Sequence, residues 1–175
     1  FETDGLNPYK RYSAGIACYY TGPRPAYHEW PNFFFSGSYV QPTYGDETNF
    51  DALYDLRVNS NPVVNNTAGS IVGYKYFNFS LLDPDKEAEL LLSLKPLGVE
   101  GTVDVMVGSP WPTAGGVKIG TLHLDKDARQ EITEMRIDVP KAKDFKGKQA
   151  LFFVFSSDTP DKSLCELHNL VFAGR

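Results

Sequence analysis

The chain has 175 residues, of which 42% are hydrophobic, and it carries a formal net charge of −5. This length predicts one domain, or one domain with an extension, with enough residues to bury a core. The acidic balance argues against nucleic acid as a partner, because contacts with phosphates require an excess of basic side chains. The longest apolar runs, such as the one from Glu89 to Leu94, are far too short to span a bilayer, so we expect no membrane partner.

The first third of the chain shows no regular pattern. It opens with FETDGLNPYK, which has neither a start methionine nor a signal-peptide pattern, so we expect a longer native polypeptide to precede Phe1. From Tyr9 to Tyr54 the sequence is rich in Tyr, Phe, Pro, Gly and Asn and has little strand or helix periodicity. We interpret residues 1–36 as an amino-terminal extension or the remnant of a preceding domain, and residues 37–175 as the folded module.

Strand signals dominate the remainder. Short apolar or alternating runs are separated by turn clusters, and they predict seven strands at 71–79, 88–94, 101–107, 117–124, 134–139, 149–155 and 164–172. The sequence from Asp83 also fits the start of a helix, but its tail, AELLLSL, reads equally well as a strand. Seven short strands without long helices predict an all-β fold, a jelly-roll β-sandwich of two antiparallel sheets.

Side-chain alternation predicts how these strands face the core. The run ALFFVFSS is apolar on both faces and predicts a central strand covered on both sides. Two other strands have a clear inward face, formed by Val103, Val105 and Val107 and by Met135, Ile137 and Val139. The strand from Val117 to Leu124 divides into one face with Val117, Ile119, Thr121 and His123, and another with Lys118, Gly120, Leu122 and Leu124.

No pattern of catalytic residues is recognisable. The histidines at 28, 123 and 168 have no metal-ligand spacing. The loop SPWPTAGG lacks the Lys-Ser/Thr of a phosphate-binding loop, and no G-x-S-x-G turn occurs. The carboxylates are scattered, and no pair stands out as the acid and base of a glycosidase. Cys18 and Cys165 fit either a disulfide or two buried thiols.

The stretch NNTAGSIVGYKYFNFS at residues 65–80 resembles the entry strand of family 6 carbohydrate-binding modules, of the kind fused behind family 43 glycoside hydrolases. Three further stretches follow in the family's order, namely GVEGTVDVMVGSPWPTAGGVKIGTLHL, ITEMRIDVPKAKDFKGKQALFFVFSS and SLCELHNLVFAG. The resemblance covers about residues 60–175. It implies a jelly-roll sandwich that binds plant polysaccharides such as xylan and keeps a catalytic hydrolase domain of the same chain on its substrate. It also implies an extracellular or periplasmic location.

The resemblance interprets GYKYFNF, with four aromatic rings between Tyr74 and Phe79, as a structural strand. We therefore expect most of these rings to pack in the core, with one or two on an exposed sheet face. Many modules of this family carry a structural calcium ion bound by oxygen ligands. The sequence does not identify the ligands here.

The family's sugar site lies in loops at one end of the sandwich and uses two aromatic rings and an Asn. At the corresponding positions this chain offers Ile71, Arg129 with Gln130, and Glu166, so the usual clamp is missing. Arg129 and Glu166 fit a polar site for sugar hydroxyls or an ion pair with each other, and we favour the pair slightly.

Five residues are the ligand-binding candidates: Trp111, Arg129, Glu166, Tyr74 and Asn66. Trp111, in a loop between two prolines, is expected to be exposed and to supply the main aromatic contact, supported at the same end by Arg129 and Glu166 for hydroxyls; loop packing is its alternative role. Trp30 fits either a ligand contact or an interface with a lost neighbour. The leading function is a non-catalytic carbohydrate-binding module. The alternatives are a structural module that buttresses a catalytic domain and, least favoured, an enzyme in its own right.

Overall fold

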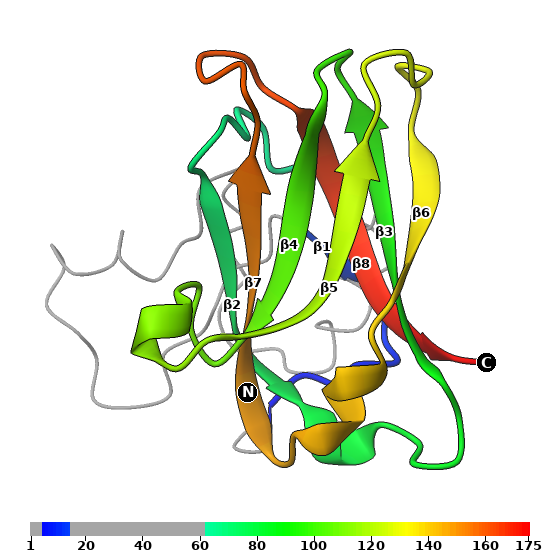
Figure 1. The fold of residues 1–175 in the computed structure, drawn as a ribbon. Helices are drawn as coiled ribbons and strands as arrows, with labels where there is room; N and C mark the ends of the chain where they lie inside the picture. The colour runs from blue at the N-terminus through cyan, green and yellow to red at the C-terminus, as the bar shows by residue number, and fades with distance from the viewer. Residues whose placement is uncertain (1–4, 15–61) are drawn as a thin grey trace, which may run out of the picture.

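The computed structural model describes residues 5–14 and 62–175, and these residues form two antiparallel four-stranded sheets packed face to face (Figure 1). In sheet A the strand order is β2 (Ile71–Asn78), β7 (Lys148–Ser156), β4 (Gly101–Val107) and β5 (Val117–Leu124). In sheet B it is β1 (Tyr12–Ser13), β8 (Cys165–Gly174), β3 (Ala88–Pro96) and β6 (Thr133–Asp138). The predicted all-β sandwich is confirmed.

The connections within the described residues contain three short 3-10 helices, η2 (Phe79–Leu81), η3 (Pro112–Ala114) and η4 (Pro140–Asp144). No helix in the described ranges is long and apolar enough to cross a membrane. The seven predicted strands are all present, with ends within two residues of the prediction. The competing helix after Asp83 is wrong, because Ala88–Pro96 is the strand β3. In the part of the chain that the structure describes, the strand that the sequence pattern did not reveal is β1.

Residues 5–14 join both sheets. The N–H of Leu6 donates to the carbonyl of Tyr76, and the N–H of Asn78 donates to the carbonyl of Leu6, so this segment bridges to β2 of sheet A. A few residues later, Tyr12 and Ser13 pair with β8 of sheet B. Leu6, Tyr12 and Ala14 are all buried in the core. The proposed boundary between residues 36 and 37 lies outside the described residues.

The aromatic stretch of β2 is mainly a core element. Tyr74, Phe77 and Phe79 are at most 1% exposed, whereas Tyr76 is 44% exposed. Strict alternation would put Tyr74 and Phe77 on opposite faces of the sheet. The pairing with β7 slips between these two residues, and this bulge turns both rings inward. The expectation that most rings pack in the core and one remains exposed is confirmed.

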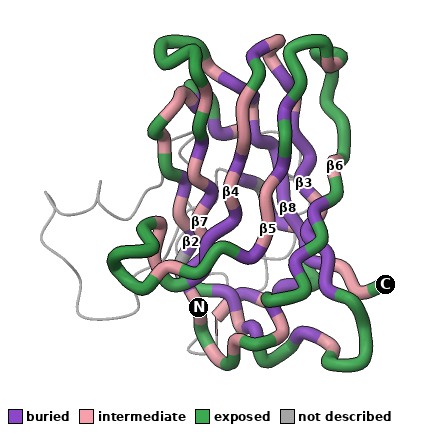
Figure 2. The backbone as a smooth tube through the Cα atoms, viewed as in Figure 1, coloured by how far each residue is buried: buried purple, intermediate pink, exposed green. Residues whose placement is uncertain are grey.

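These rings connect the two sheets. Phe77 makes edge-to-face contacts with Tyr12, Tyr74 and Phe172, with ring centroids 5.7, 6.4 and 5.9 Å away. Tyr12 and Phe172 belong to sheet B, so the contacts cross the interior of the sandwich. The hydroxyl of Tyr74 donates a 2.9 Å hydrogen bond to the carbonyl of Ala14. The cluster therefore fixes the amino-terminal segment to both sheets. Figure 2 shows the buried positions along the strands and the exposed ones in the loops at either end.

Alternation predicts the inward faces of β4 and β6 correctly but not that of β5. In β5, Ile119 is an extra residue, because Val105 lies opposite Gly120 and Met106 opposite Lys118. Ile119 and Leu122 are therefore both buried, although the alternating pattern put them on different faces. Gly120 is required at this bulge, since a Cβ there would lie 2.7 Å from Cγ2 of Ile137 on sheet B.

Tyr74→Phe tests the buried hydrogen bond to Ala14. We expect a loss of about 1–3 kcal/mol in the free energy of unfolding, because the Ala14 carbonyl is left without this donor inside the core. Tyr76→Phe removes the same hydroxyl from an exposed ring and is the matched control, with a change within about 0.5 kcal/mol. Urea denaturation measures both. Equal effects of the two substitutions would contradict the role assigned to Tyr74.

Candidate functional site

The loops gather at two opposite ends of the sandwich (Figure 1). Pairing of β4 with β5 puts Gly101 opposite Leu124 at one end and Val107 opposite Val117 at the other. We call the first the Glu166 end, which contains the loops 62–70, 97–100, 125–132 and 157–164. We call the second the Trp111 end, which contains 79–87, 108–116 and 139–147. Trp111 therefore does not share a site with Arg129 and Glu166, and the expectation that these two residues support Trp111 at one end is wrong.

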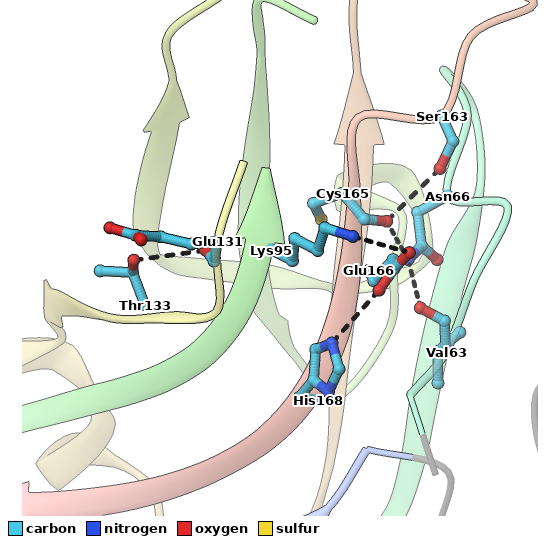
Figure 3. A network of polar contacts seen from close by, with 9 residues as sticks. All are labelled: Val63, Asn66, Lys95, Glu131, Thr133, Ser163, Cys165, Glu166 and His168. Carbon is cyan, nitrogen blue, oxygen red and sulfur yellow. Dashed lines mark hydrogen bonds and ion pairs between the residues drawn. The ribbon is translucent and has the colours of Figure 1, made fainter. Parts of the chain in front are cut away.

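Asn66 is a structural residue at the Glu166 end. Its side chain is 2% exposed, and its Nδ2 donates to the carbonyls of Val63 and Cys165 at 2.9 and 3.0 Å. Its own backbone carbonyl accepts from the N–H of Leu164. These bonds tie the 62–70 loop to the start of β8 (Figure 3). Neither Asn66 nor Tyr74, which is 1% exposed, offers its side chain to a ligand in this structure.

Arg129 and Glu166 do not form the ion pair that we favoured. The guanidinium of Arg129 lies 3.7 Å from Glu131, and its side chain is 88% exposed, so this pair contributes little to stability. Glu166 instead faces two other groups. Its Oε1 lies 3.9 Å from Nζ of Lys95, and its Oε2 lies 3.4 Å from Nε2 of His168.

Glu166, Lys95 and His168 form a polar cluster on the outer surface of sheet B (Figure 3). The carboxylate of Glu166 is half-buried, and His168 is buried with no hydrogen bond at either ring nitrogen. A carboxylate beside an ammonium group offers an acceptor and a donor to sugar hydroxyls. Among the described residues at this end, however, no Phe, Tyr or Trp side chain is exposed.

Trp111 lies in a loop whose conformation is fixed by hydrogen bonds within its own backbone. The carbonyl of Trp111 accepts from the N–H groups of Ala114 and Gly116, both at 3.0 Å, and its N–H donates to Oγ of Ser109. A Cβ at Gly116 would lie 2.2 Å from the Ser109 carbonyl, so only glycine fits there. Trp111 is nevertheless 56% exposed. The loop thus presents an indole ring on a fixed backbone, which suits stacking against an apolar face of a ligand.

The outer face of sheet A is a third surface. The register aligns Ile71, Val154 and Asp104 across three strands, and Val154 is only partly buried. Asp104 accepts a 2.6 Å hydrogen bond from the hydroxyl of Thr121 and lies 3.3 Å from Nζ of Lys118. The predicted central position of β7 in its sheet is confirmed. The prediction that both faces of β7 are covered is not, because apolar side chains on its outer face, such as Val154, are partly exposed beside Asp104.

Metal-binding chemistry finds no support in the described residues. No three His, Cys, Asp or Glu side chains among residues 5–14 and 62–175 are placed to hold an ion together. Calcium sites also use backbone carbonyl oxygens, so the structural calcium ion that the resemblance implies stays a prediction.

Comparisons with known proteins find the fold but no sequence family. No protein-family profile and no curated protein sequence matches the chain. Two solved family 6 carbohydrate-binding modules match over nearly their whole length. The β-1,3-glucan-binding module from Bacillus halodurans has a TM-score of 0.59 and 16% identity, covering 97% of this chain and 98% of that one. The module from Clostridium cellulolyticum in complex with xylose has a TM-score of 0.58 and 16% identity, covering 96% and 99%.

A third match is part of an enzyme. The family 43 arabinoxylan arabinofuranohydrolase from Bacillus subtilis, in complex with cellotetraose, has a TM-score of 0.61 and 19% identity over 98% of this chain. This chain spans only 28% of that enzyme's length. The fold of family 6 carbohydrate-binding modules, expected from the resemblance, is thus confirmed for this chain.

Cys165 is a free thiol inside the core, while Cys18 lies outside the described residues. Burial, and then the negative charge of Glu166, raises the pKa of the Cys165 thiol from 9.0 to about 12. Above pH 9 the unfolded chain therefore loses this proton while the folded chain keeps it. The contribution of Cys165 to stability is complete below pH 9 and falls as the pH rises toward 12.

Cys165→Ala isolates this effect. Wild type is expected to be more stable at pH 8, because the substitution leaves a cavity. Between pH 8 and pH 10.5 the difference in the free energy of unfolding between wild type and variant should narrow by about 2 kcal/mol. The reason is that wild type loses about 1.4 kcal/mol of stability for each pH unit above 9. Urea denaturation of both proteins under reducing conditions measures the difference, in which other titrating groups cancel. A difference independent of pH would contradict the raised pKa.

Proposed function

We propose that this chain is a non-catalytic module that binds a glycan and that Trp111 is its main contact. The full-length match to modules described as binding β-1,3-glucan or xylose supports the ligand class. The observation that carries the proposal is the exposed indole of Trp111 on its hydrogen-bonded loop. A glycan chain has apolar C–H faces that stack on such a ring.

Stacking matters because sugar hydroxyls exchange hydrogen bonds with water for similar bonds with protein, at small net gain. Burial of apolar surface adds about 25 cal/mol per Å². A fixed loop also lowers the entropy lost when the ring is ordered by its ligand. An exposed, preorganised Trp is therefore expected to contribute more affinity than the polar cluster around Glu166.

We propose plant-type glycans such as xylan as the ligand, a catalytic glycoside hydrolase domain in the same chain as the partner, and an extracellular or periplasmic location. The likeness to part of an arabinoxylan arabinofuranohydrolase supports the pairing with a hydrolase. In this arrangement the module and the catalytic domain belong to one chain. A glycan bound by the module therefore stays close to the catalytic domain, which raises the local concentration of substrate there.

A structural module is the second candidate, and one observation favours it. At the Glu166 end, where modules of this fold are expected to bind sugar, the described residues present no exposed Phe, Tyr or Trp side chain. Such a module would buttress a catalytic domain without a glycan of its own. In that case Trp111 would contact the neighbouring domain, because exposed Trp side chains are also frequent anchors of protein interfaces.

Trp111→Ala tests the main proposal by calorimetric titration with xylo-oligosaccharides and soluble β-glucans. The substitution should weaken binding by about 1–3 kcal/mol, the range for a stacked ring at a binding site. The melting temperature should change little, because the ring is more than half exposed. Trp111→Phe keeps an aromatic face and should retain part of the affinity.

Glu166→Gln is the control at the opposite end of the sandwich, and it should leave the affinity within about twofold of wild type. A lower melting temperature with unchanged binding for Trp111→Ala would assign Trp111 to loop packing. If wild type bound none of the glycans, the structural module would become the leading function.

A calcium ion remains a prediction from the resemblance alone. Thermal melts with and without EDTA test it. A melting temperature that falls on chelation and recovers with added calcium would establish a site that uses residues beyond those described or backbone carbonyls. An unchanged melting temperature would remove calcium from the account.

A further inference from the structure

Two segments that are far apart in the sequence share one edge of β8. Tyr12 lies opposite Leu170, and Ser13 lies opposite Asn169. The N–H of Ala14 then donates to the carbonyl of His168 at 2.9 Å. Leu167, which precedes His168 in β8, exchanges two backbone hydrogen bonds with Val63, at 2.7 and 2.9 Å.

Four successive residues of β8, from Leu170 back to Leu167, thus have a backbone partner on this edge. Residues 12–14 lie opposite the first three and Val63 lies opposite the fourth, with no position of β8 skipped. Neighbouring residues along a strand are about 3.3–3.4 Å apart. Residues 12–14 and Val63 therefore occupy adjacent positions along the edge of sheet B. The two pieces continue one edge strand.

We infer that residues 15–61 are an insertion within this edge strand, and that residues 5–14 together with 62–175 form a sandwich that folds without them. The inference rests on the residues that flank the insertion and not on the proposed glycan site. It replaces the earlier division at residue 37. A module that starts at residue 37 lacks Leu6, Tyr12 and Ala14, which are part of the core.

Contacts of the short amino-terminal segment support this assignment. Leu6, Tyr12 and Ala14 are at most 4% exposed, and Ala14 accepts the hydrogen bond from Tyr74. Arg11 reaches across the outer face of sheet B: its Nη1 donates to Oδ1 of Asn169 on β8 at 2.6 Å, and its Nη2 lies 2.8 Å from Glu134. Glu134 is on β6, the far edge strand of the sheet.

The segment that follows residues 15–61, which begins at Pro62, is also fixed to the sandwich by burial and hydrogen bonds. Val63 is 1% exposed, and Asn66 bonds back to Val63 and across to β8. A long insertion raises the entropy cost of bringing the two halves of the edge strand together, because this cost grows with loop length. Replacement of residues 15–61 by a short linker lowers that cost and leaves these contacts in place.

A pair of deletions in the full chain tests the inference. In the first variant, Gly-Ser-Gly replaces residues 15–61 between Ala14 and Pro62. In the second, residues 1–14 are removed and the long insertion is kept. We expect the first variant to keep the strand-type circular dichroism spectrum, a cooperative melt and a melting temperature within a few degrees of wild type. The second variant, although it loses fewer residues, should melt at a much lower temperature or fail to fold.

A cleavage experiment covers the case in which a deletion fails to fold for an unrelated reason. A protease site is placed between Gly37 and Ser38 of the full chain, and the folded protein is cut there. The two fragments should co-elute on gel filtration and separate only in denaturant, because residues 5–14 hold the shorter fragment to the sandwich. Dissociation of the fragments under native conditions would overturn the inference. So would a first variant that is less stable than the second.

Discussion

The packing of Phe77 between the two sheets is the interaction on which the fold depends. This ring lies on β2 of sheet A and contacts Tyr12 and Phe172 of sheet B. It faces inward only because β2 bulges between Tyr74 and Phe77. The same bulge directs Tyr74 toward Ala14, so one irregularity places two rings in the core and secures the amino-terminal segment. Edge-to-face pairs of this kind add about 0.5–1.5 kcal/mol each to the burial of their surfaces.

The outer faces of the sheets differ in chemistry. Sheet B is crossed by ion pairs, such as Arg11 with Glu134 and Arg136 with the nearly buried carboxylate of Glu89. Near the end of β8, the guanidinium of Arg175 hydrogen-bonds to Glu87 and lowers the pKa of that carboxyl group. These groups satisfy one another. Sheet A carries partly exposed apolar residues, and Trp111 follows its strand β4. The apolar surface that is open to a ligand or partner therefore lies on sheet A and at the Trp111 loop.

The sequence predicts regular features of this fold and misses irregular ones. The alternating valines of β4 predict the bounds and the inward face of that strand, because alternation follows burial. The apolar run of β7 predicts its central position in the sheet. Ile119 lies on a face that alternation does not predict, because a bulge is a property of the pairing between β4 and β5. Strand β1 is only two residues long and follows Arg11, so it has no periodicity to detect.

The candidate site is harder to predict for a related reason. Exposure of Trp111 follows from its neighbouring prolines and glycines, which exclude a strand interior. Its end of the sandwich does not follow, because that depends on the direction of each strand. Asn66 and Tyr74 have the side chains of sugar-binding residues, yet their polar groups satisfy backbone carbonyls in the core. Composition gives no sign of this difference between a ligand contact and a structural hydrogen bond.

Nuclear magnetic resonance tests most directly the central claim that the Trp111 loop binds a glycan. In a ¹H–¹⁵N spectrum, each of the two tryptophans at positions 30 and 111 gives one indole N–H signal. Addition of xylohexaose to the full chain should shift the indole signal of Trp111 and the amide signals of residues 108–116, in proportion to saturation. Amides near Glu166, at the opposite end, should remain in place. Shifts confined to the Glu166 end, with the indole signal of Trp111 unmoved, would contradict the account.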